Sequence, residues 1–286
     1  MEAMLKIAIQ KSGRLSEGSI DLLKKCSLKF RNSHNQLMTP VQNFDAQLLF
    51  LRDDDIPQYV QDGVADVGII GENVFLEHQA DVEVVKKLGF SKCRVCLAIP
   101  KNEQYTGVEY FRGKNIATSY PNILKTFLAT HGLEAGIHNI SGSVEIAPSI
   151  GLAEAIMDIV STGSTLLSNG LKEVETVLRS EAILIANKGM GKEDKALLQE
   201  ILFRIESVLK ARDFKYVLLN APNDKIQDIV EMLPGMKSPT VLPLAESGWS
   251  SIHSVMSEGK FWENIDRLKS LGAQGILIVP IEKMVL

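Results

Sequence analysis

The stretch DIVSTGST at residues 158–165 and the stretch DVGIIGEN at residues 66–73 follow one pattern, which decides the fold. Each begins with Asp, continues through apolar residues to a Gly, and then opens a polar segment typical of a helix start. The sequence predicts a helix of similar length before each stretch, over residues 56–62 and 150–156. This repeat favours two similar α/β lobes. Both strand–loop–helix turns would lie at the mouth of a shared cleft, because open sheets bind ligands beyond the carboxyl ends of their strands.

Short β-rich runs alternate with amphipathic segments over most of the chain, as in βα units around covered sheets. The strands predicted in the first part span residues 5–10, 47–52, 64–70 and 92–100, and the helices span residues 16–25 and 53–63. Three acids, Asp53, Asp54 and Asp55, open the second of these helices. We interpret them as structural, because acids at a helix start favour the positive end of its dipole.

The pattern changes from residue 215 onward. Strands are predicted over residues 216–219, 240–244, 251–256 and 275–281, with helices over residues 223–233 and 261–271. That βαββαβ order is typical of a ferredoxin-like module. We therefore predict a first lobe over residues 1–92, to which residues 181–212 return, a second lobe over residues 93–180, and a separate domain over residues 213–286.

Composition restricts the class of protein. With 45% hydrophobic and 23% charged residues, the chain fits a globular protein of two or three domains. The apolar run at residues 7–9 is too short for a signal peptide or a membrane span, so we expect a cytoplasmic protein. A net charge of −4 and the lack of a basic cluster interleaved with aromatics argue against nucleic acid as a partner.

The cysteines and histidines give no sign of a metal or redox site. Cys26, Cys93 and Cys96 are too few for a disulfide scaffold. Cys93 and Cys96 have C-x-x-C spacing but lie in a predicted strand, where we expect them to pack as small hydrophobic residues. The five histidines are scattered without metal-ligand spacing. Hydrolase, nucleoside-triphosphatase and dehydrogenase motifs are missing as well.

The loop after residue 160 has the composition of a phosphate cradle. Gly163 lets the backbone approach a ligand, hydroxyls are available, and the start of a helix expected near Leu166 presents backbone N–H groups. An ordinary Ser/Thr-rich helix cap has the same composition and remains an alternative. The candidate phosphate-binding residues are Ser161, Thr162, Gly163, Ser164 and Thr165.

Charged residues beside the two turns extend this candidate site. Glu154 and Asp158 precede the loop, and such carboxylates hold ribose hydroxyls or the outer shell of a Mg²⁺ ion on a diphosphate. The alternative makes Glu154 a solvated helix residue and Asp158 a strand-edge residue. Lys11 and Arg14 flank a glycine in another strand-to-helix turn, which is either a second anion contact or solvated surface.

Several ordered segments together resemble the ATP phosphoribosyltransferase family, the first enzyme of histidine biosynthesis. The resemblance covers essentially the whole chain and rests on residues 10–15, 52–57, 66–73, 116–121, 139–145, 158–166, 237–244 and 280–284. It implies the long form of the enzyme. In that form two periplasmic-binding-protein-like lobes make the catalytic cleft, and a C-terminal ACT-like domain binds histidine as a feedback inhibitor.

The same resemblance implies the chemistry. The family uses Mg²⁺ to join ATP and 5-phosphoribosyl diphosphate, releasing diphosphate and forming the N1-phosphoribosyl adduct of ATP. Its members interconvert between dimers and hexamers. By the family's pattern the loop from Ser161 to Thr165 holds the 5-phosphate, and Asp158 with Glu154 holds the ribose hydroxyls. The same pattern assigns Lys11, Arg14 and Arg52 to ATP phosphates or diphosphate. We assign Ser238, Thr240 and Gly275 to histidine by their position near the strand starts of the last domain.

Two alternatives remain at this stage. A non-catalytic solute receptor also has two lobes around a cleft, and a βαββαβ module also serves amino-acid sensors. A receptor for a neutral solute would need neither the acids and hydroxyls around the loop nor the cations of the first turn. A catalytically silent relative of the enzyme is the other alternative, which the intact loop disfavours.

Overall fold

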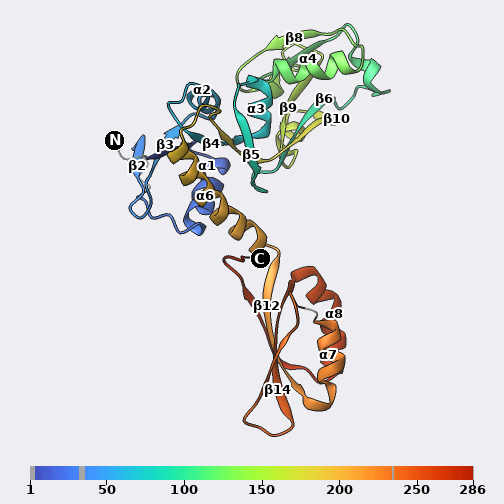
Figure 1. Cartoon of the computed structure of the whole chain (residues 1–286). Helices are drawn as coiled ribbons and strands as arrows, with labels where there is room; N and C mark the ends of the chain where they lie inside the picture. Colours follow the sequence, from blue (N-terminus) through green and yellow to red (C-terminus); the bar gives the residue numbers. More distant parts are fainter. Residues whose placement is uncertain (1–3, 32–35, 234, 286) are drawn as a thin grey trace. The chain divides into compact units, whose positions relative to one another are not determined.

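The computed structural model describes residues 4–31, 36–233 and 235–285. The chain divides into two compact units, Met1–Leu198 and Gln199–Leu286 (Figure 1). The boundary falls inside the long helix α6, Lys192–Ala211. Among the described residues, no helix is both long and apolar enough to cross a membrane.

The first unit contains two sheets, and we call the first sheet with its helices the first lobe. Its strand order is β2-β3-β1-β4-β11-β5, with β1, β3 and β4 parallel. The strands are β1 Leu5–Gln10, β2 Met38–Pro40, β3 Ala46–Leu51, β4 Val67–Gly71, β5 Glu83–Lys87 and β11 Ala182–Ala186. The helices are α1 Arg14–Lys25, η1 Asp53–Asp55, α2 Ile56–Gln61 and α3 Glu72–His78. Because β1, β3 and β4 are parallel, the turns that follow them gather at one edge of the sheet.

The second sheet and its helices form the second lobe. Its strand order is β10-β6-β9-β7-β8. The strands are β6 Cys93–Pro100, β7 Asn115–Thr118, β8 Gly136–Asn139, β9 Ala155–Val160 and β10 Leu171–Ser180. The helices are η2 Val108–Phe111, α4 Pro121–Thr130, η3 Val144–Ile146 and α5 Ser164–Ser168. Since β9 is parallel to β7, the turn that follows β9 lies at the same edge as the turn between β7 and α4.

Glu77 of α3 links the two lobes. Its carboxylate accepts the backbone N–H of Asn122 at 2.9 and 3.1 Å and that of Ile123 at 3.0 Å, both in the first turn of α4. In return the Asn122 amide donates to the Glu77 carbonyl at 2.9 Å. The residue at the N-cap of α4, Tyr120, makes no side-chain capping bond. A residue of the first lobe therefore caps a helix of the second.

The second unit has the predicted βαββαβ order. Its elements are β12 Phe214–Pro222, η4 Asn223–Lys225, α7 Ile226–Met232, β13 Thr240–Pro243, β14 Trp249–Ser257, α8 Glu258–Ser270 and β15 Gln274–Pro280. The strands pair antiparallel in the order β13-β14-β12-β15. The two longer helices pack on one face of this sheet through Ile229 and Phe261, while Leu277 and Val279 of β15 stay exposed.

The predicted fold class is confirmed, with two α/β lobes and a ferredoxin-like C-terminal unit. The helix predicted over residues 150–156 is wrong, because residue 155 already begins β9. Ala155, Ile156 and Met157 are fully buried between β6 and β7. A strand covered on both faces has a continuous apolar run, which periodicity alone does not separate from a buried helix.

Candidate active site

A cavity of about 220 Å³ lies between the turns of the two lobes. It is lined by Gln10, Arg14, Leu15, Asp53, Gly71, Asn73, Val74, Ser91, Lys92, Cys93, Ile159 and Ser161. The repeated stretches at residues 66–73 and 158–165 both contribute to this lining. The shared cleft that the repeat predicts is therefore present, and its wall combines one cation-bearing turn with one hydroxyl-bearing turn.

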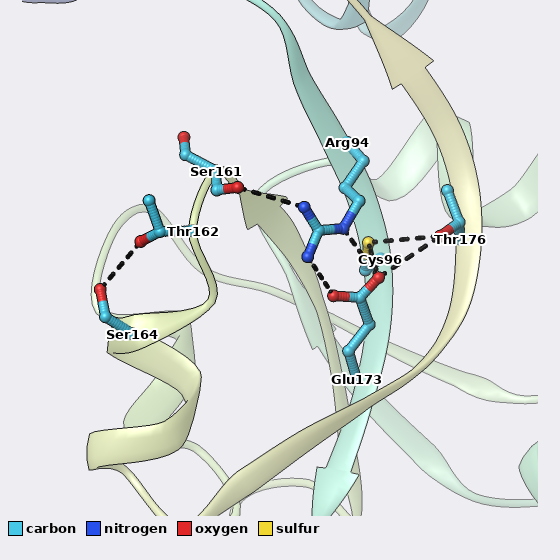
Figure 2. A network of polar contacts seen from close by, with 7 residues as sticks. All are labelled: Arg94, Cys96, Ser161, Thr162, Ser164, Glu173 and Thr176. Carbon is cyan, nitrogen blue, oxygen red and sulfur yellow. Dashed lines mark hydrogen bonds and ion pairs between the residues drawn. The ribbon is translucent and has the colours of Figure 1, made fainter.

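The hydroxyl-rich loop joins β9 to α5. Gly163 has φ 81° and ψ 0°, a left-handed conformation that favours glycine. A Cβ atom built on it would find Val160 no closer than 3.9 Å, so backbone conformation rather than space requires glycine here. The hydroxyls of Thr162 and Ser164 lie 3.0 Å apart (Figure 2). The helix begins at Ser164 rather than at Leu166, so the loop leads directly into its first turn.

Asp158 is a half-buried carboxylate in β9, two residues from the strand's end. Its Oδ1 accepts the backbone N–H of Ile159 at 2.7 Å. Burial is the main cause that raises the pKa of Asp158, and the neighbouring charge of Glu145 raises it further. Glu145 belongs to η3 and is half-buried. The acid that accompanies Asp158 is therefore Glu145, which sequence analysis did not select.

Glu154 lies away from the loop. It stands before the first residue of β9, whereas the loop follows the last, and a strand of this length spans about 20 Å. Its Oε2 accepts the backbone N–H of Asn115 at 2.7 Å, a bond that lowers the pKa of Glu154. The prediction that Glu154 directly precedes the loop is wrong, because the residues between them form an extended strand.

The three predicted cations are near one another but not equivalent. Arg14, the first residue of α1, lines the cavity. Lys11 is exposed in the turn after β1, where its backbone N–H donates to the Leu51 carbonyl at 2.8 Å. Arg52 is exposed directly after β3 and is not part of the cavity lining. Lys92, which the sequence placed at the start of a strand, instead lies in the connection between the lobes and lines the cavity.

Acids of the first lobe also face the cleft. Asp53 lines the first cavity, and Asp54 lines a second cavity of about 250 Å³ together with Ser119, Tyr120 and Asn139 of the second lobe. Burial, and then the charges of Asp158, Asp54 and Asp53, raise the pKa of Tyr120. The three acids at residues 53–55 form the short helix η1. Arg52 at its N-cap makes no side-chain capping bond. Asp53 and Asp54 therefore line cavities of the cleft while they also open a helix, so the structural interpretation does not describe their whole environment.

The three residues assigned to histidine do not come together within one chain. Thr240 lies in β13 and Gly275 in β15, which are the opposite edges of the C-terminal sheet. Two strands separate them, which corresponds to about 14 Å. Ser238 is exposed just before β13. Gly275 has φ 57° at a register shift beside Asn220, so its glycine is explained by backbone geometry.

The chain matches two family models. The model described as HisG, ATP phosphoribosyltransferase, matches residues 52–207, more than half of the 286 residues. The chain belongs to the ATP phosphoribosyltransferase family. In this phosphoribosyltransferase, residues 211–283 match the model described as HisG, C-terminal domain, which corresponds to the ferredoxin-like unit.

Named relatives agree with this assignment to the phosphoribosyltransferases. The ATP phosphoribosyltransferase of Bacteroides fragilis is 58% identical over 283 residues, which cover 99% of this chain and 100% of that protein. The enzyme of Phocaeicola vulgatus is 59% identical with the same coverage. Among solved structures, the ATP phosphoribosyl transferase (HisG:HisZ) complex from Thermotoga maritima is similar, with a TM-score of 0.60 and 29% identity. The similarity covers 71% of this chain and 99% of that one.

The protein is therefore an enzyme, a glycosyltransferase of the first step of histidine biosynthesis. The alternative of a non-catalytic solute receptor, which shares the two-lobed architecture, is wrong.

Proposed function

We propose that this enzyme transfers the 5-phosphoribosyl group of phosphoribosyl diphosphate to N1 of the adenine of ATP and releases diphosphate. The observation that carries the proposal is the cavity of about 220 Å³ in which Arg14 and Asp53 of the first lobe face Ser161 of the second. A sugar 5-phosphate that carries a diphosphate needs cations for the diphosphate, an acid for the hydroxyls of its ring, and a hydroxyl-rich loop for the 5-phosphate.

The loop from Ser161 to Thr165 is proposed to hold the 5-phosphate. Gly163 has the left-handed conformation that occurs in turns whose successive backbone N–H groups bind anions. The first N–H groups of α5 have no acceptor within the helix and are available to phosphate oxygens. Hydroxyls of Thr162 and Ser164 stand beside them.

Asp158 is proposed to accept the ribose hydroxyls. It lies on the strand that leads into the loop. Glu145 stands close enough to influence its ionisation and forms the second acid of this site. Ionised carboxylates only accept hydrogen bonds, so both suit hydroxyl donors.

Arg14 and Lys92 are proposed to bind the diphosphate in the cavity. Both line it, and together they supply the charge that a leaving diphosphate needs. Lys11 and Arg52 lie at the same sheet edge outside the lining, and they are proposed to contact the phosphates of ATP.

The carboxylates present fit a Mg²⁺ ion that arrives with the diphosphate. In the part of the chain that the structure describes, no group of three or more His, Cys, Asp or Glu side chains is arranged to hold a metal. Mg²⁺ in phosphate sites typically takes one or two protein carboxylates besides substrate oxygens and water. Asp53 in the cavity wall supplies one such carboxylate. When bound, Mg²⁺ would neutralise charge on the diphosphate.

The chemistry requires positioning more than proton transfer. Departure of diphosphate leaves positive charge on the ring oxygen and anomeric carbon, which the acids near the ribose stabilise. Adenine N1 already carries a lone pair, so no side-chain base has to deprotonate it. The protein's task is to hold N1 in line with the anomeric carbon while the cleft excludes water.

We also propose that histidine inhibits the enzyme through the C-terminal unit and that the enzyme assembles into dimers and hexamers. Support comes from the match of residues 211–283 to the HisG C-terminal domain. Because Thr240 and Gly275 lie on opposite sheet edges, variants of each distinguish the two edges. Relief of inhibition by Thr240→Val but not by Gly275→Ala would assign the site to the β13 edge. Light scattering with and without histidine measures the assembly.

The test of the proposed reaction is release of diphosphate by the purified protein with Mg²⁺, ATP and phosphoribosyl diphosphate. Replacing Gly163 by Val should abolish binding of phosphoribosyl diphosphate, because a β-branched residue does not adopt the left-handed conformation without strain. The matched control is Gly113→Val, which has φ 72° and open space around its Cβ but lies at the opposite end of the sheet. Unchanged affinity of the Gly163 variant in calorimetry would remove the loop from the site, and absence of diphosphate release would refute the reaction.

A further inference from the structure

Arg94 connects the hydroxyl-rich loop to a strand on the far side of β6. Its guanidinium donates to Glu173 of β10 through Nε at 2.8 Å and Nη2 at 2.6 Å, a bidentate pair. Its Nη1 donates to the carbonyl of Ser161 at 3.1 Å (Figure 2). Ser161 is the first residue after β9, so this bond holds the loop at its origin.

Glu173 is itself fixed in place. Besides the two bonds from Arg94, its Oε1 accepts the thiol of Cys96 at 3.0 Å and the hydroxyl of Thr176 at 3.4 Å. Arg94 is the main cause that lowers the pKa of Glu173 to about 2, so the carboxylate stays charged at neutral pH. Planar, bidentate pairing gives Arg94 one orientation, which a lysine does not reproduce.

Arg94 is placed to act through the loop and not on the ligand. It does not belong to the lining of the cavity between the lobes. Each of its three nitrogens already donates to an acceptor, and Glu173 balances its charge. In a planar trans peptide the C=O and N–H point in opposite directions. By holding the Ser161 carbonyl, Arg94 therefore directs the N–H of Thr162 away from itself, into the loop.

We propose that Arg94, clamped by Glu173, is a positioning residue that orients the Ser161–Thr162 peptide so that its N–H meets the 5-phosphate of phosphoribosyl diphosphate. This inference rests on the proposed function of the loop. It adds a residue that holds the loop in place without contacting the ligand. The 5-phosphate does not react, so the contact is equally strong before and during transfer of the ribosyl group. Loss of Arg94 should raise the KM for this substrate and leave kcat unchanged.

The first variant is Arg94→Lys, which keeps the charge and removes the bidentate geometry. We expect the Kd and KM for phosphoribosyl diphosphate to rise about tenfold, as for one charge-assisted hydrogen bond. The KM for ATP should stay unchanged and kcat should stay within about twofold. Glu173→Gln removes the clamp, leaves Arg94 in place and should act in the same direction. The double variant should be no worse than the stronger single one, because both act through one contact.

Fragments of phosphoribosyl diphosphate show which part of the substrate loses affinity in the Arg94 variant. Arg94→Lys should weaken binding of ribose 5-phosphate by the same factor as phosphoribosyl diphosphate and leave binding of inorganic diphosphate unchanged. The control is Arg112→Lys in the same lobe. Arg112 makes a similar bidentate pair with Glu109 at 2.7 and 3.0 Å and reaches the Gly132 carbonyl at 3.4 Å. Arg112→Lys should leave the affinities for phosphoribosyl diphosphate, ribose 5-phosphate and inorganic diphosphate unchanged.

The outcomes separate this inference from the proposed function. Gly163→Val could abolish the binding of phosphoribosyl diphosphate while Arg94→Lys and Glu173→Gln leave it unchanged. The proposed role of the loop would then be retained, and the role of Arg94 would be refuted. If Arg94 only stabilised the fold, its replacement would weaken the binding of ATP, diphosphate and ribose 5-phosphate together. That result would also refute the proposed role of Arg94. If the wild-type protein releases no diphosphate and binds no phosphoribosyl diphosphate, both proposals fail.

Discussion

Replacement of Glu77, which lies in the first lobe, should destabilise the first turn of α4 in the second lobe. Two residues of that turn would lose their backbone hydrogen bonds to the Glu77 carboxylate. Glu77 is only 9% exposed, and its carboxylate accepts two backbone N–H groups of α4. Loss of an N-cap costs about 1 kcal/mol, and loss of a negative charge at a helix start costs up to about 1 kcal/mol more. Glu77→Ala should therefore cost roughly 2 kcal/mol. Glu77→Gln, which keeps one acceptor oxygen, should cost about 1 kcal/mol.

Hydrogen exchange measures this effect locally, which matters because unfolding of a chain with several units is not a two-state process. The amides of Asn122 and Ile123 should exchange roughly 30-fold faster in Glu77→Ala and about fivefold faster in Glu77→Gln. The amide of His131 at the other end of α4, which donates within its own helix, should be unaffected. Glu83→Gln, at an exposed acid of β5, is the control. Equal exchange of Asn122 in Glu77→Ala and wild type would show that this carboxylate does not cap α4.

Two further predictions concern the acids whose pKa values are shifted. Burial raises the pKa of Asp158, so the folded state binds its proton more tightly than the unfolded state, and this acid costs stability once the pH exceeds its usual pKa of 3.8. Asp158→Asn should therefore raise the melting temperature at neutral pH while lowering kcat/KM about 10- to 100-fold, and a lower melting temperature would contradict the burial argument. Glu173 contributes to stability with the opposite sign, because its pKa is lowered from 4.5 to about 2 in the folded state. Its ionised carboxylate therefore stabilises the folded state above pH 4.5, and this stabilisation is lost as the pH falls toward 2. Glu173→Gln should thus lower the urea midpoint clearly at about pH 7 and less at about pH 3, and a constant difference would argue against the ion pair with Arg94.

Sequence patterns predicted the elements whose signals are local. The βαββαβ order of the last unit followed from strands and helices with clear periodicity and turn residues. The meeting of the two repeated turns followed from the rule that ligands bind at the carboxyl ends of strands. Arg14 and the loop at residues 161–165 were selected as candidates for the same reason, because each belongs to the turn after a recognisable strand.

Contacts between distant parts of the chain were not predictable in this way. Arg94 and Glu173 are 79 residues apart, and Glu77 lies 45 residues before Asn122. No periodicity connects such positions. Glu154 was misplaced because the apolar run after it suits a buried strand and a buried helix equally well. Glu145 and Tyr120 were missed because their relation to Asp158 depends on how β7, β8 and β9 are paired.

The network behind the loop has a chemical consequence for its own thiol. Cys96 is buried and donates to Glu173, and burial followed by this hydrogen bond raises the pKa of Cys96 to about 12. Cys96 therefore stays a thiol at neutral pH, and the thiolate is the form that oxidants and alkylating reagents attack. A C-x-x-C spacing that suggests redox chemistry in other proteins is thus kept inert here. The carboxylate that fixes the loop also shields the sulfur beside it from oxidation.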